Sequence, residues 1–271
     1  MQHDRVNTGM RTSTLNTDGA SAPVEALSHL PPPPALLQRP ALFLDMDGVL
    51  APLAATPDAV VPDPRRTAVL RGLATRLDGR VAIISGRTIA EIDRIAERAA
   101  VPASGVHGLE RRRADGSLDH AAPAPTVRDV VVAFDRFARD RPGVIVEDKL
   151  VSAGLHYRGA PDEAAAAEAL ARSLAGETGL ALQSGNLVVE LKTPGTDKGT
   201  ALKAFMLEPP FAGAIPVMLG DDLTDEDGFR AAAALGGFGV LVGPQRPTAA
   251  TFALSDVEAV LDWLDTVEAR P

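Results

Sequence analysis

The chain has 271 residues, 45% of them hydrophobic, and carries a formal net charge of −9 at pH 7. This length accommodates one large domain or a core domain with a smaller inserted one. The negative charge argues against a surface that holds nucleic acid or an anionic membrane, since both depend on clustered Lys and Arg. The chain contains no cysteine, which excludes disulfides, thiolate zinc sites and a cysteine nucleophile.

The N-terminal part has a composition of its own. Residues 1–38 are rich in Thr, Ser, Asp and Pro, and four consecutive prolines occupy positions 31–34. This segment follows neither helical nor strand periodicity, which predicts a mobile tail stiffened by polyproline II. The N-terminus lacks the apolar stretch of a secretory signal, and no apolar run approaches the roughly 20 residues of a membrane helix. We therefore expect a cytoplasmic protein.

Beyond the tail, strand-like apolar runs alternate with helical patterns, which is typical of a parallel sheet with helices on both faces. The first such unit contains a strand at 41–44, a helix at 65–77 and a strand at 81–84. A second helix then begins with Thr88 and Glu91, which have the spacing of a capping box.

A later unit repeats this alternation near the C-terminus. It contains a helix at 198–206, a strand at 215–219 and a helix that ends at Gly236 and Gly237. The last helix is expected to begin at Ser255, because a glutamate follows three residues later and an apolar stripe runs along the helix.

Between about residues 110 and 194 the rhythm changes. Two helical stretches, 126–139 and 161–175, are interleaved with alternating strands, which predicts an antiparallel sheet with one polar face. Gly185 and Asn186 predict the tight turn of its last hairpin. We therefore expect an α/β fold with a parallel-sheet core and an inserted α+β domain. The predicted parts are a tail at 1–38, a core at 39–109 and 195–271, and an insert at 110–194.

Two carboxylates, Asp45 and Asp47, directly follow the first strand, at the edge where ligands bind in open α/β sheets. A phosphate that faces such a pair is repelled by about 4 kcal/mol per pair of unit charges at ~4 Å and an effective dielectric constant near 20. A divalent cation is therefore required, and ligands that are all oxygen point to Mg²⁺. Asp45 could then attack phosphorus, while Asp47 could protonate the leaving oxygen. The alternative is a simple Asp turn at a strand end.

Two further features could hold a phosphate. Ser85, Gly86 and Arg87 stand between the second strand and a helix, where a hydroxyl and backbone N–H groups meet the positive helix end. Lys198 begins its own helix and could neutralise phosphate charge. Taken alone, the first feature also fits an ordinary helix cap, and the second a solvated surface lysine.

An acidic segment follows the strand at 215–219. It contains Asp221, Asp222, Asp225 and Glu226. The helix dipole accounts for the last two, which stand at a helix N-terminus. It accounts less well for the adjacent pair Asp221 and Asp222, which favours a metal site.

These four features occur in the order and strand-end context of the haloacid dehalogenase superfamily, which the chain resembles from about Ala41 to the C-terminus. Further motifs narrow the resemblance to bacterial trehalose-6-phosphate phosphatases. These motifs are Gly105-Val-His107-Gly108-Leu-Glu110, Glu147-Asp-Lys149, His156-Tyr-Arg158, Glu190-Leu-Lys192 and Gly220-Asp-Asp-Leu-Thr-Asp-Glu226.

The resemblance implies a Rossmann-like core with a cap inserted between the second and third motifs. It implies Mg²⁺ held by Asp45, by the backbone carbonyl of Asp47 and by Asp221, with Asp222 and Asp225 in support. Ser85 and Lys198 would contact the phosphate of the substrate, a small sugar phosphate. The other residues assigned to substrate binding are Arg87, His107, Glu110, Glu147, Lys149, His156, Arg158, Glu190 and Lys192. Val49 departs from the Thr often found in relatives, which removes a hydroxyl near the nucleophile loop.

Strand alternation predicts how the insert contributes to specificity. Glu147 with Lys149, His156 with Arg158, and Glu190 with Lys192 are i, i+2 pairs, so each pair projects from one sheet face. The intervening apolar residues are expected to pack on the insert helices; they are Val146, Leu155, Tyr157, Val189 and Leu191. The polar face would then close over the active site. The alternative is an ordinary solvated sheet face.

The resemblance thus implies hydrolysis of trehalose 6-phosphate through an aspartyl phosphate on Asp45. We expect a monomer rather than an oligomer. Two alternatives lie within the same superfamily: a phosphatase for another sugar phosphate, and a phosphomutase. A different class of alternative is a catalytically silent sugar-phosphate sensor. A nucleotide-dependent kinase is disfavoured, because the sequence has no GxxxxGK[ST] loop.

Overall fold

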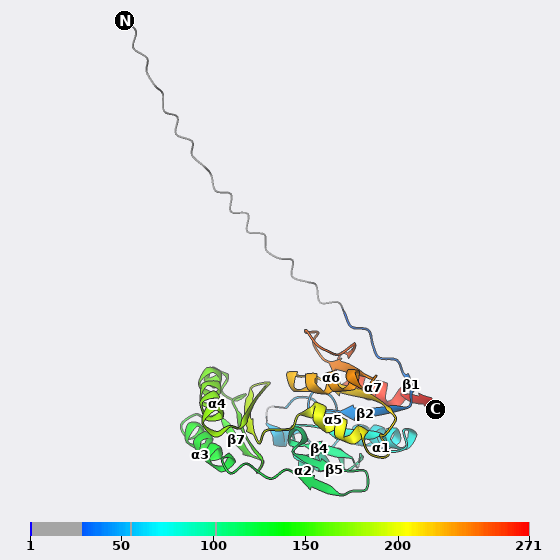
Figure 1. The fold of residues 1–271 in the computed structure, drawn as a ribbon, viewed down its shortest axis with the longest axis horizontal. Helices are drawn as coiled ribbons and strands as arrows, with labels where there is room; N and C mark the ends of the chain where they lie inside the picture. The colour runs from blue at the N-terminus through cyan, green and yellow to red at the C-terminus, as the bar shows by residue number, and fades with distance from the viewer. Residues whose placement is uncertain (2–28, 55, 101, 271) are drawn as a thin grey trace.

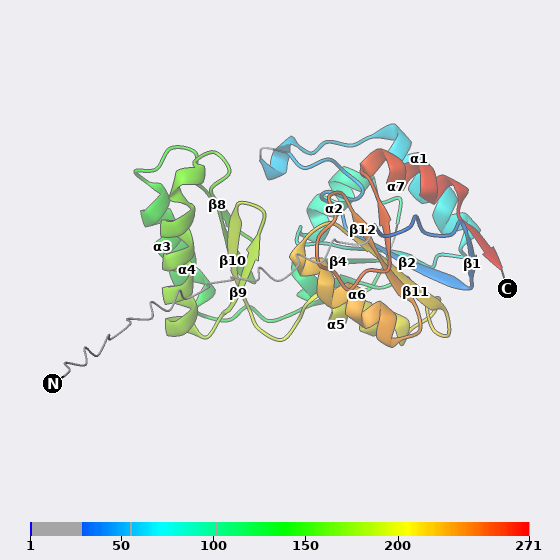
Figure 2. The same ribbon diagram turned by 90° about the horizontal axis from the view of Figure 1, so that it is seen from above.

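The computed structural model describes residues 1, 29–54, 56–100 and 102–270 of the chain (Figure 1). Most of the predicted tail, residues 2–28, lies outside this description. Two sheets dominate the fold, a larger one and a smaller one that stands apart from it (Figure 2). Within the described part of the chain, no helix has the length and apolar content that a bilayer crossing requires.

The larger sheet has the parallel arrangement expected from the alternation of strands and helices. Its strands, in spatial order, are β13 (Phe252–Leu254), β12 (Phe238–Val242), β11 (Ile215–Gly220), β2 (Pro40–Leu44), β3 (Val81–Ile84), β4 (Ala103–Gly105), β5 (Glu110–Arg112) and β6 (Leu118–His120). Neighbouring strands run parallel from β13 to β4. Strands β5 and β6 are antiparallel.

The start of the insert differs from the predicted boundary at residue 110. Strand β5 pairs with β4, with Glu110 opposite Gly105, and β6 pairs with β5. Both strands therefore extend the larger sheet instead of belonging to the insert. Their sequences, Glu-Arg-Arg and Leu-Asp-His, contain no apolar run, so a pattern search for core strands does not find them.

Helices cover both faces of the larger sheet (Figure 2). One face packs against α1 (Pro64–Arg76), α2 (Ile89–Ala96) and α7 (Val257–Thr266). The other face packs against α5 (Lys198–Met206) and α6 (Glu226–Ala234). This two-sided covering is the arrangement that the strand and helix pattern predicts.

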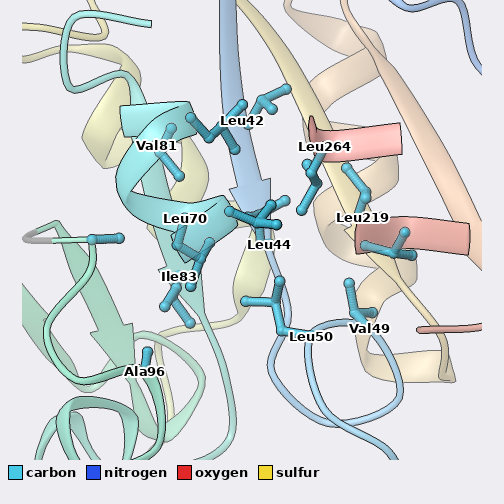
Figure 3. Close-up of a cluster of buried hydrophobic side chains, with 14 of the residues drawn as sticks. Leu42, Leu44, Val49, Leu50, Leu70, Val81, Ile83, Ala96, Leu219 and Leu264 are labelled. Atoms are coloured by element: carbon cyan, nitrogen blue, oxygen red, sulfur yellow. The ribbon is translucent and has the colours of Figure 1, made fainter. Parts of the chain in front are cut away.

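The alternation of side chains in β2 explains why the strand is apolar along its whole length. Leu42 and Leu44 point into the hydrophobic cluster that the sheet shares with α1 and α7 (Figure 3). Ala41 and Phe43 point into the opposite cluster, where Phe43 stacks on Phe211 with ring centroids 5.4 Å apart. Burying both faces fixes the strand, and it thereby fixes the position of Asp45, the next residue.

Helix ends agree with the predicted signals in α2 and differ in α7. Thr88 caps α2 in the expected capping box with Glu91. The N-cap of α7 is Asp256 instead of Ser255, because the Asp256 carboxylate accepts the N–H of Ala259. The Ser255 hydroxyl donates to Asp256, so it supports the cap without forming it.

The insert carries the smaller sheet, with spatial order β7 (Ile145–Asp148), β8 (Ser152–His156), β10 (Val188–Lys192) and β9 (Ala181–Gly185). All its pairings are antiparallel, as predicted. Helices α3 (Val127–Ala138) and α4 (Ala164–Thr178) pack on one face of this sheet, with a hydrophobic cluster of their own. The β9–β10 hairpin turns through Asn186 and Leu187, one residue later than predicted, since Gly185 is paired with Val188.

The chain leaves and re-enters the core at one place. Residues 121–126 lead from β6 to the insert, and residues 193–197 lead from the insert to α5. The backbone N–H of Ala124 donates to the hydroxyl of Thr193 at 3.1 Å, which joins the two connections.

The prediction of a mobile tail is wrong for residues 34–38, which lie just before β2. Strand β1 (Leu36–Gln38) pairs with β14 (Glu268–Arg270), and Leu37 is 6% exposed. The indole N–H of Trp263 donates to the carbonyl of Pro34 at 3.2 Å. Prolines lack a backbone N–H but retain the carbonyl, so a Pro-rich segment can still be held as an acceptor.

Candidate active site

The carboxyl ends of the core strands and the polar face of the smaller sheet line a common cavity. Most predicted site residues meet there: Asp45, Asp47, Ser85, Arg87, His107, Glu147, Lys149, His156, Arg158, Glu190, Lys198, Asp221 and Asp222. Residues from segments more than 100 positions apart in the chain therefore share one site. The structure places Glu110, Lys192 and Asp225 outside the cavity lining.

Asp45 lines this cavity, directly after β2, and the residue is 5% exposed. One carboxylate oxygen, Oδ1, accepts the N–H of Met46 at 2.7 Å. The other, Oδ2, lies 2.8 Å from Lys198 Nζ. Burial raises the pKa of Asp45, while the Lys198 ammonium opposes that rise.

Lys198 is held by two acids at once. Its ammonium lies 2.7 Å from Asp225 Oδ1 as well as 2.8 Å from Asp45 Oδ2. Burial disfavours its charge, yet the carboxylates of Asp225 and Asp45 hold its pKa well above the ordinary value. The lysine is therefore a permanent cation next to Asp45.

Asp225 organises the acidic loop that follows β11. Its Oδ2 accepts the backbone N–H groups of Asp221 at 3.0 Å and Asp222 at 3.1 Å, while Oδ1 accepts from Lys198. A Cβ atom at Gly220 would lie 2.2 Å from the Asp225 carboxyl carbon, so this close approach requires glycine. Asp225 thus anchors the loop that carries the other two acids.

Asp45, Asp221 and Asp225 bring carboxylate oxygens within 4.8 Å of one another. Burial, followed by repulsion from Asp45 and Asp222, raises the pKa of Asp221 to about 8. Such mutual repulsion among hard oxygen ligands fits a divalent cation of the Mg²⁺ type. Asp225 already accepts three N–H donors, so Asp45 and Asp221 are the side chains that fit the ion best.

The Asp47 side chain is turned toward Arg87. Two parallel contacts join them, Nε to Oδ2 and Nη2 to Oδ1, both at 2.7 Å. Arg87 also contacts Glu91 at 3.2 Å. A bidentate arginine fixes the orientation of a carboxylate as well as its position, so Arg87 acts here on Asp47 and lies at the cavity wall.

Ser85 directly follows β3 and precedes α2, as the motif predicts. It is 1% exposed, and its hydroxyl accepts the N–H of Arg87 at 3.3 Å. The Ser85 side chain therefore lines the same cavity as Asp45. The backbone N–H groups of Thr88 and Ile89, at the start of α2, are instead accepted by Glu91 and Glu110.

On the side that faces the core, the insert carries a group of polar side chains joined by hydrogen bonds and ion pairs. Lys149 Nζ donates to the carbonyl of Gly86 at 3.0 Å and lies 3.3 Å from Glu190 and 3.4 Å from Glu147. His156 lies 2.8 Å from Glu147. Burial would raise the pKa of Glu190, but Lys149 and His107 hold it well below the ordinary value.

Alternation in the insert strands follows the predicted pattern. Leu155, Tyr157, Val189 and Leu191 are buried in the cluster with α3 and α4, and Val146 packs against that cluster. Glu190 and Lys149 are themselves buried, at 6% and 9% exposure, against the core. The polar face is therefore covered by the core instead of being an ordinary solvated surface.

Three predicted binding residues have other neighbours. Glu110 Oε2 accepts the N–H of Ile89 at 2.7 Å, at the start of α2. Lys192 Nζ donates to the carbonyl of Thr196 at 2.9 Å. Arg158 lines the cavity but donates to the carbonyl of Asn186 at 3.0 Å. The first two support backbone segments beside the site.

Two residues with site contacts were missed by the sequence analysis. Gln183 lines the cavity directly across from Glu190 in the β9–β10 pairing. Arg246 donates to the carbonyls of Asp222 at 2.6 Å and Asp221 at 3.4 Å, and it also pairs with Glu226. Strand alternation could have indicated Gln183, because it shares a face with Glu190. Arg246 lies in a loop and gives no comparable signal.

An α/β core with paired acids at two neighbouring strand ends, covered by an inserted α+β unit, defines a capped phosphohydrolase of the haloacid dehalogenase type. Comparison with known proteins narrows this class. The family model for trehalose-phosphatase matches residues 43–258.

Individual relatives agree with the family match. The chain is 41% identical over 236 residues to the trehalose-6-phosphate phosphatase of Escherichia coli (strain K12), covering 86% of this chain and 88% of the relative. It is 38% identical to a probable trehalose-phosphate phosphatase of Sinorhizobium fredii, covering 80% and 82%. The C-terminal domain of the trehalose-6-phosphate phosphatase of C. albicans superposes with a TM-score of 0.75 and 26% identity, covering 84% and 91%. The chain therefore belongs to the trehalose-phosphatase family of phosphoric monoester hydrolases.

Proposed function

We propose that this chain hydrolyses trehalose 6-phosphate to trehalose and inorganic phosphate. The proposal is supported by the family match and by relatives with this activity in their names. The observation that carries it is the Asp45 carboxylate, paired with Lys198, beneath the polar face of the insert in one cavity. The phosphate end of the substrate would lie at Asp45 and the sugar end against the insert.

In the first step, a carboxylate oxygen of Asp45 forms a bond to phosphorus. The bond between phosphorus and the sugar oxygen breaks, and its electron pair passes to that oxygen, which takes a proton from Asp47. The products of this step are trehalose and an aspartyl phosphate. Lys198 and Ser85 would contact the phosphoryl oxygens, since both side chains face the cavity.

In the second step, water attacks phosphorus and gives a proton to Asp47. The bond between phosphorus and Asp45 breaks, which restores the carboxylate and releases inorganic phosphate. Arg87 would orient the ionised Asp47 through its two 2.7 Å contacts, and one of these contacts would open when Asp47 carries the proton.

Mg²⁺ would be held by Asp45, by Asp221 and by the backbone carbonyl of Asp47, while Asp222 and Asp225 support the loop. The ion would offset the repulsion between the carboxylates and the phosphate. The assignment is supported by the carboxylate oxygens of Asp45, Asp221 and Asp225, which lie within 4.8 Å of one another. The pKa of Asp221, which burial and neighbouring acids raise to about 8, agrees with it.

The insert would act as the sugar-binding lid. Its side chains Glu147, Lys149, His156, Arg158 and Glu190 line the cavity and combine donors with acceptors, which suits a molecule rich in hydroxyl groups. Glu110 and Lys192 would instead position the backbone at Ile89 and Thr196. The expected monomer stays a prediction.

A phosphate-release screen over a panel of sugar phosphates, with and without Mg²⁺, tests this function. We expect trehalose 6-phosphate to be preferred and phosphate to be released in stoichiometric amount. Asp45→Asn should abolish turnover with the fold intact, while the exposed Asp265→Asn should behave as wild type. Preference for another sugar phosphate, transfer back to sugar, or binding without release would identify a different phosphatase, a mutase or a sensor.

A further inference from the structure

A strained turn lies beside the phosphate-facing loop. In the 3-10 turn η2 (Val106–Gly108), Val106 has φ +45° and His107 has φ +52°. A β-branched residue in the left-handed region is a real outlier, and such a conformation is strained. It persists only where surrounding contacts hold it.

The contacts that hold this turn come from the loop that carries Ser85. The N–H of Val106 donates to the carbonyl of Arg87 at 2.9 Å. The N–H of His107 donates to the carbonyl of Ser85 at 3.0 Å. The turn at 106–107 is therefore joined to both ends of the segment Ser85-Gly86-Arg87, and displacement of one displaces the other.

The His107 imidazole covers Gly86. A Cβ atom at position 86 would lie 2.5 Å from His107 Nε2, so only glycine allows the ring to approach this closely. The residue is 7% exposed, and burial lowers the pKa of His107 to about 4. The ring is thus neutral near pH 7 and cannot serve as a cation for phosphate.

On its other side, the same ring meets the insert. Its Nε2 lies 2.7 Å from Gln183 Nε2 and 3.7 Å from Glu190 Oε2. Gln183 and Glu190 are directly opposite in the β9–β10 pairing, so both project from the face that lines the cavity. Gln183 adds an uncharged amide to a face otherwise dominated by charged pairs.

We propose that His107 and Gln183 form a positioning pair that couples sugar binding by the insert to the loop Ser85-Gly86-Arg87. The inference rests on the proposed function, because it needs a substrate with both a sugar and a phosphate. A sugar that orders Glu190 and Gln183 also fixes His107, and His107 fixes the backbone that faces the phosphate. A substrate without the sugar gains nothing from the pair.

Gln183→Leu tests this coupling, because leucine keeps the approximate size and removes the amide. We expect kcat/KM for trehalose 6-phosphate to fall at least about tenfold, and kcat/KM for p-nitrophenyl phosphate to change less than about threefold. Ser184→Ala, on the exposed opposite face of β9, is the matched control and should change neither value.

A double-mutant cycle makes the test specific to the pair. His107→Asn shortens the side chain while asparagine tolerates the left-handed backbone. If the two residues act together, adding Gln183→Leu to His107→Asn should lower activity on the sugar phosphate less than about threefold further. Additive losses, equal losses on both substrates, or full activity of Gln183→Leu would overturn the proposal.

Thermal unfolding of each variant confirms that the fold is retained, and Gln183→Met replaces Gln183→Leu if the latter does not fold. Failure of the proposed function can be distinguished from failure of the coupling between His107 and Gln183. If wild type hydrolyses a different sugar phosphate, the same cycle is run with that substrate, and the coupling stands or falls on its own result.

Discussion

Lys198 Nζ lies 2.8 Å from Asp45 Oδ2, with the two side chains 2% and 7% exposed. The same ammonium holds Asp225, so replacing Lys198 by methionine leaves two buried carboxylates without their cation. Removing one partner of a buried pair destabilises a protein by roughly 3–5 kcal/mol. We expect Lys198→Met to lose turnover and to unfold at a lower temperature.

Lys203→Met is the control for this variant, because it lies on the same helix with an exposed side chain. It should match wild type in phosphate release and thermal unfolding. A stable Lys198→Met protein that hydrolyses substrate within a few fold of wild type would show that the lysine is not needed at Asp45.

Chelation should abolish activity, and Mg²⁺ should restore it. Because the pKa of Asp221 is raised by burial and by Asp45 and Asp222, an added cation should also stabilise the folded protein. Thermal unfolding should shift upward with Mg²⁺ in wild type and in the exposed variant Asp227→Asn. The shift should shrink in Asp221→Asn, and an unchanged shift would place the ion elsewhere.

Glu147→Ala tests the contribution of the insert separately from the hydrolysis of the phosphate ester. Glu147 contacts His156 at 2.8 Å and Lys149 at 3.4 Å, so its loss disrupts the polar group with which the insert lines the cavity. We expect kcat/KM for trehalose 6-phosphate to fall at least about tenfold, equal to about 1.4 kcal/mol. Hydrolysis of p-nitrophenyl phosphate should change much less. Equal losses on the two substrates would assign Glu147 to structure.

Acidification should reveal the buried state of His107. Burial lowers its pKa from 6.5 to about 4, so the unfolded chain takes up a proton before the folded protein does. The stability that this neutral histidine contributes is present above its ordinary pKa and is lost as pH falls toward the folded value. Between about pH 7.5 and about pH 5, wild type should lose about 2 kcal/mol more unfolding free energy than His107→Asn. Parallel curves from denaturant titrations would show that the ring is not shielded.

The segment before β2 should matter for stability. Trp263 donates to Pro34, Glu268 donates to Ala35, and Leu37 is buried. We expect deletion of residues 1–38 to lower the melting temperature relative to deletion of residues 1–28. Identical melting curves for the two truncations would show that residues 29–38 do not stabilise the fold, as the prediction of a tail implies.

The core strands that end at the candidate active site were predictable, because burial of a strand produces a recognisable pattern of apolar residues in the sequence. Leu42 and Leu44 pack on one side of the sheet, and Ala41 and Phe43 on the other, so the whole run is apolar. Acids placed directly after such a run stand out, so the positions of Asp45 and Asp221 were predictable. The insert face was predictable for the same reason, since Leu155 and Val189 alternate with polar residues.

Contacts to backbone groups produce no such pattern in the sequence. Arg246 acts on the carbonyls of Asp221 and Asp222, and every residue has a carbonyl. Pro31 and Pro34 looked like a tail, yet their carbonyls accept N–H groups of Ala253 and Trp263. Such pairings are set by tertiary proximity, so they become visible only once the chain is folded.

The hydrogen bond from Ala124 to Thr193 closes the insert into a loop whose two ends share one location on the core. If the segment between Ala124 and Thr193 were replaced by another, the core chain would keep its path and its acids at the strand ends would stay in place. In the proposed function, the insert binds the sugar while the core carries the acids that act on the phosphate. Replacement of the insert by one of different shape is a route by which the same hydrolytic core could be redirected to a new phosphate ester.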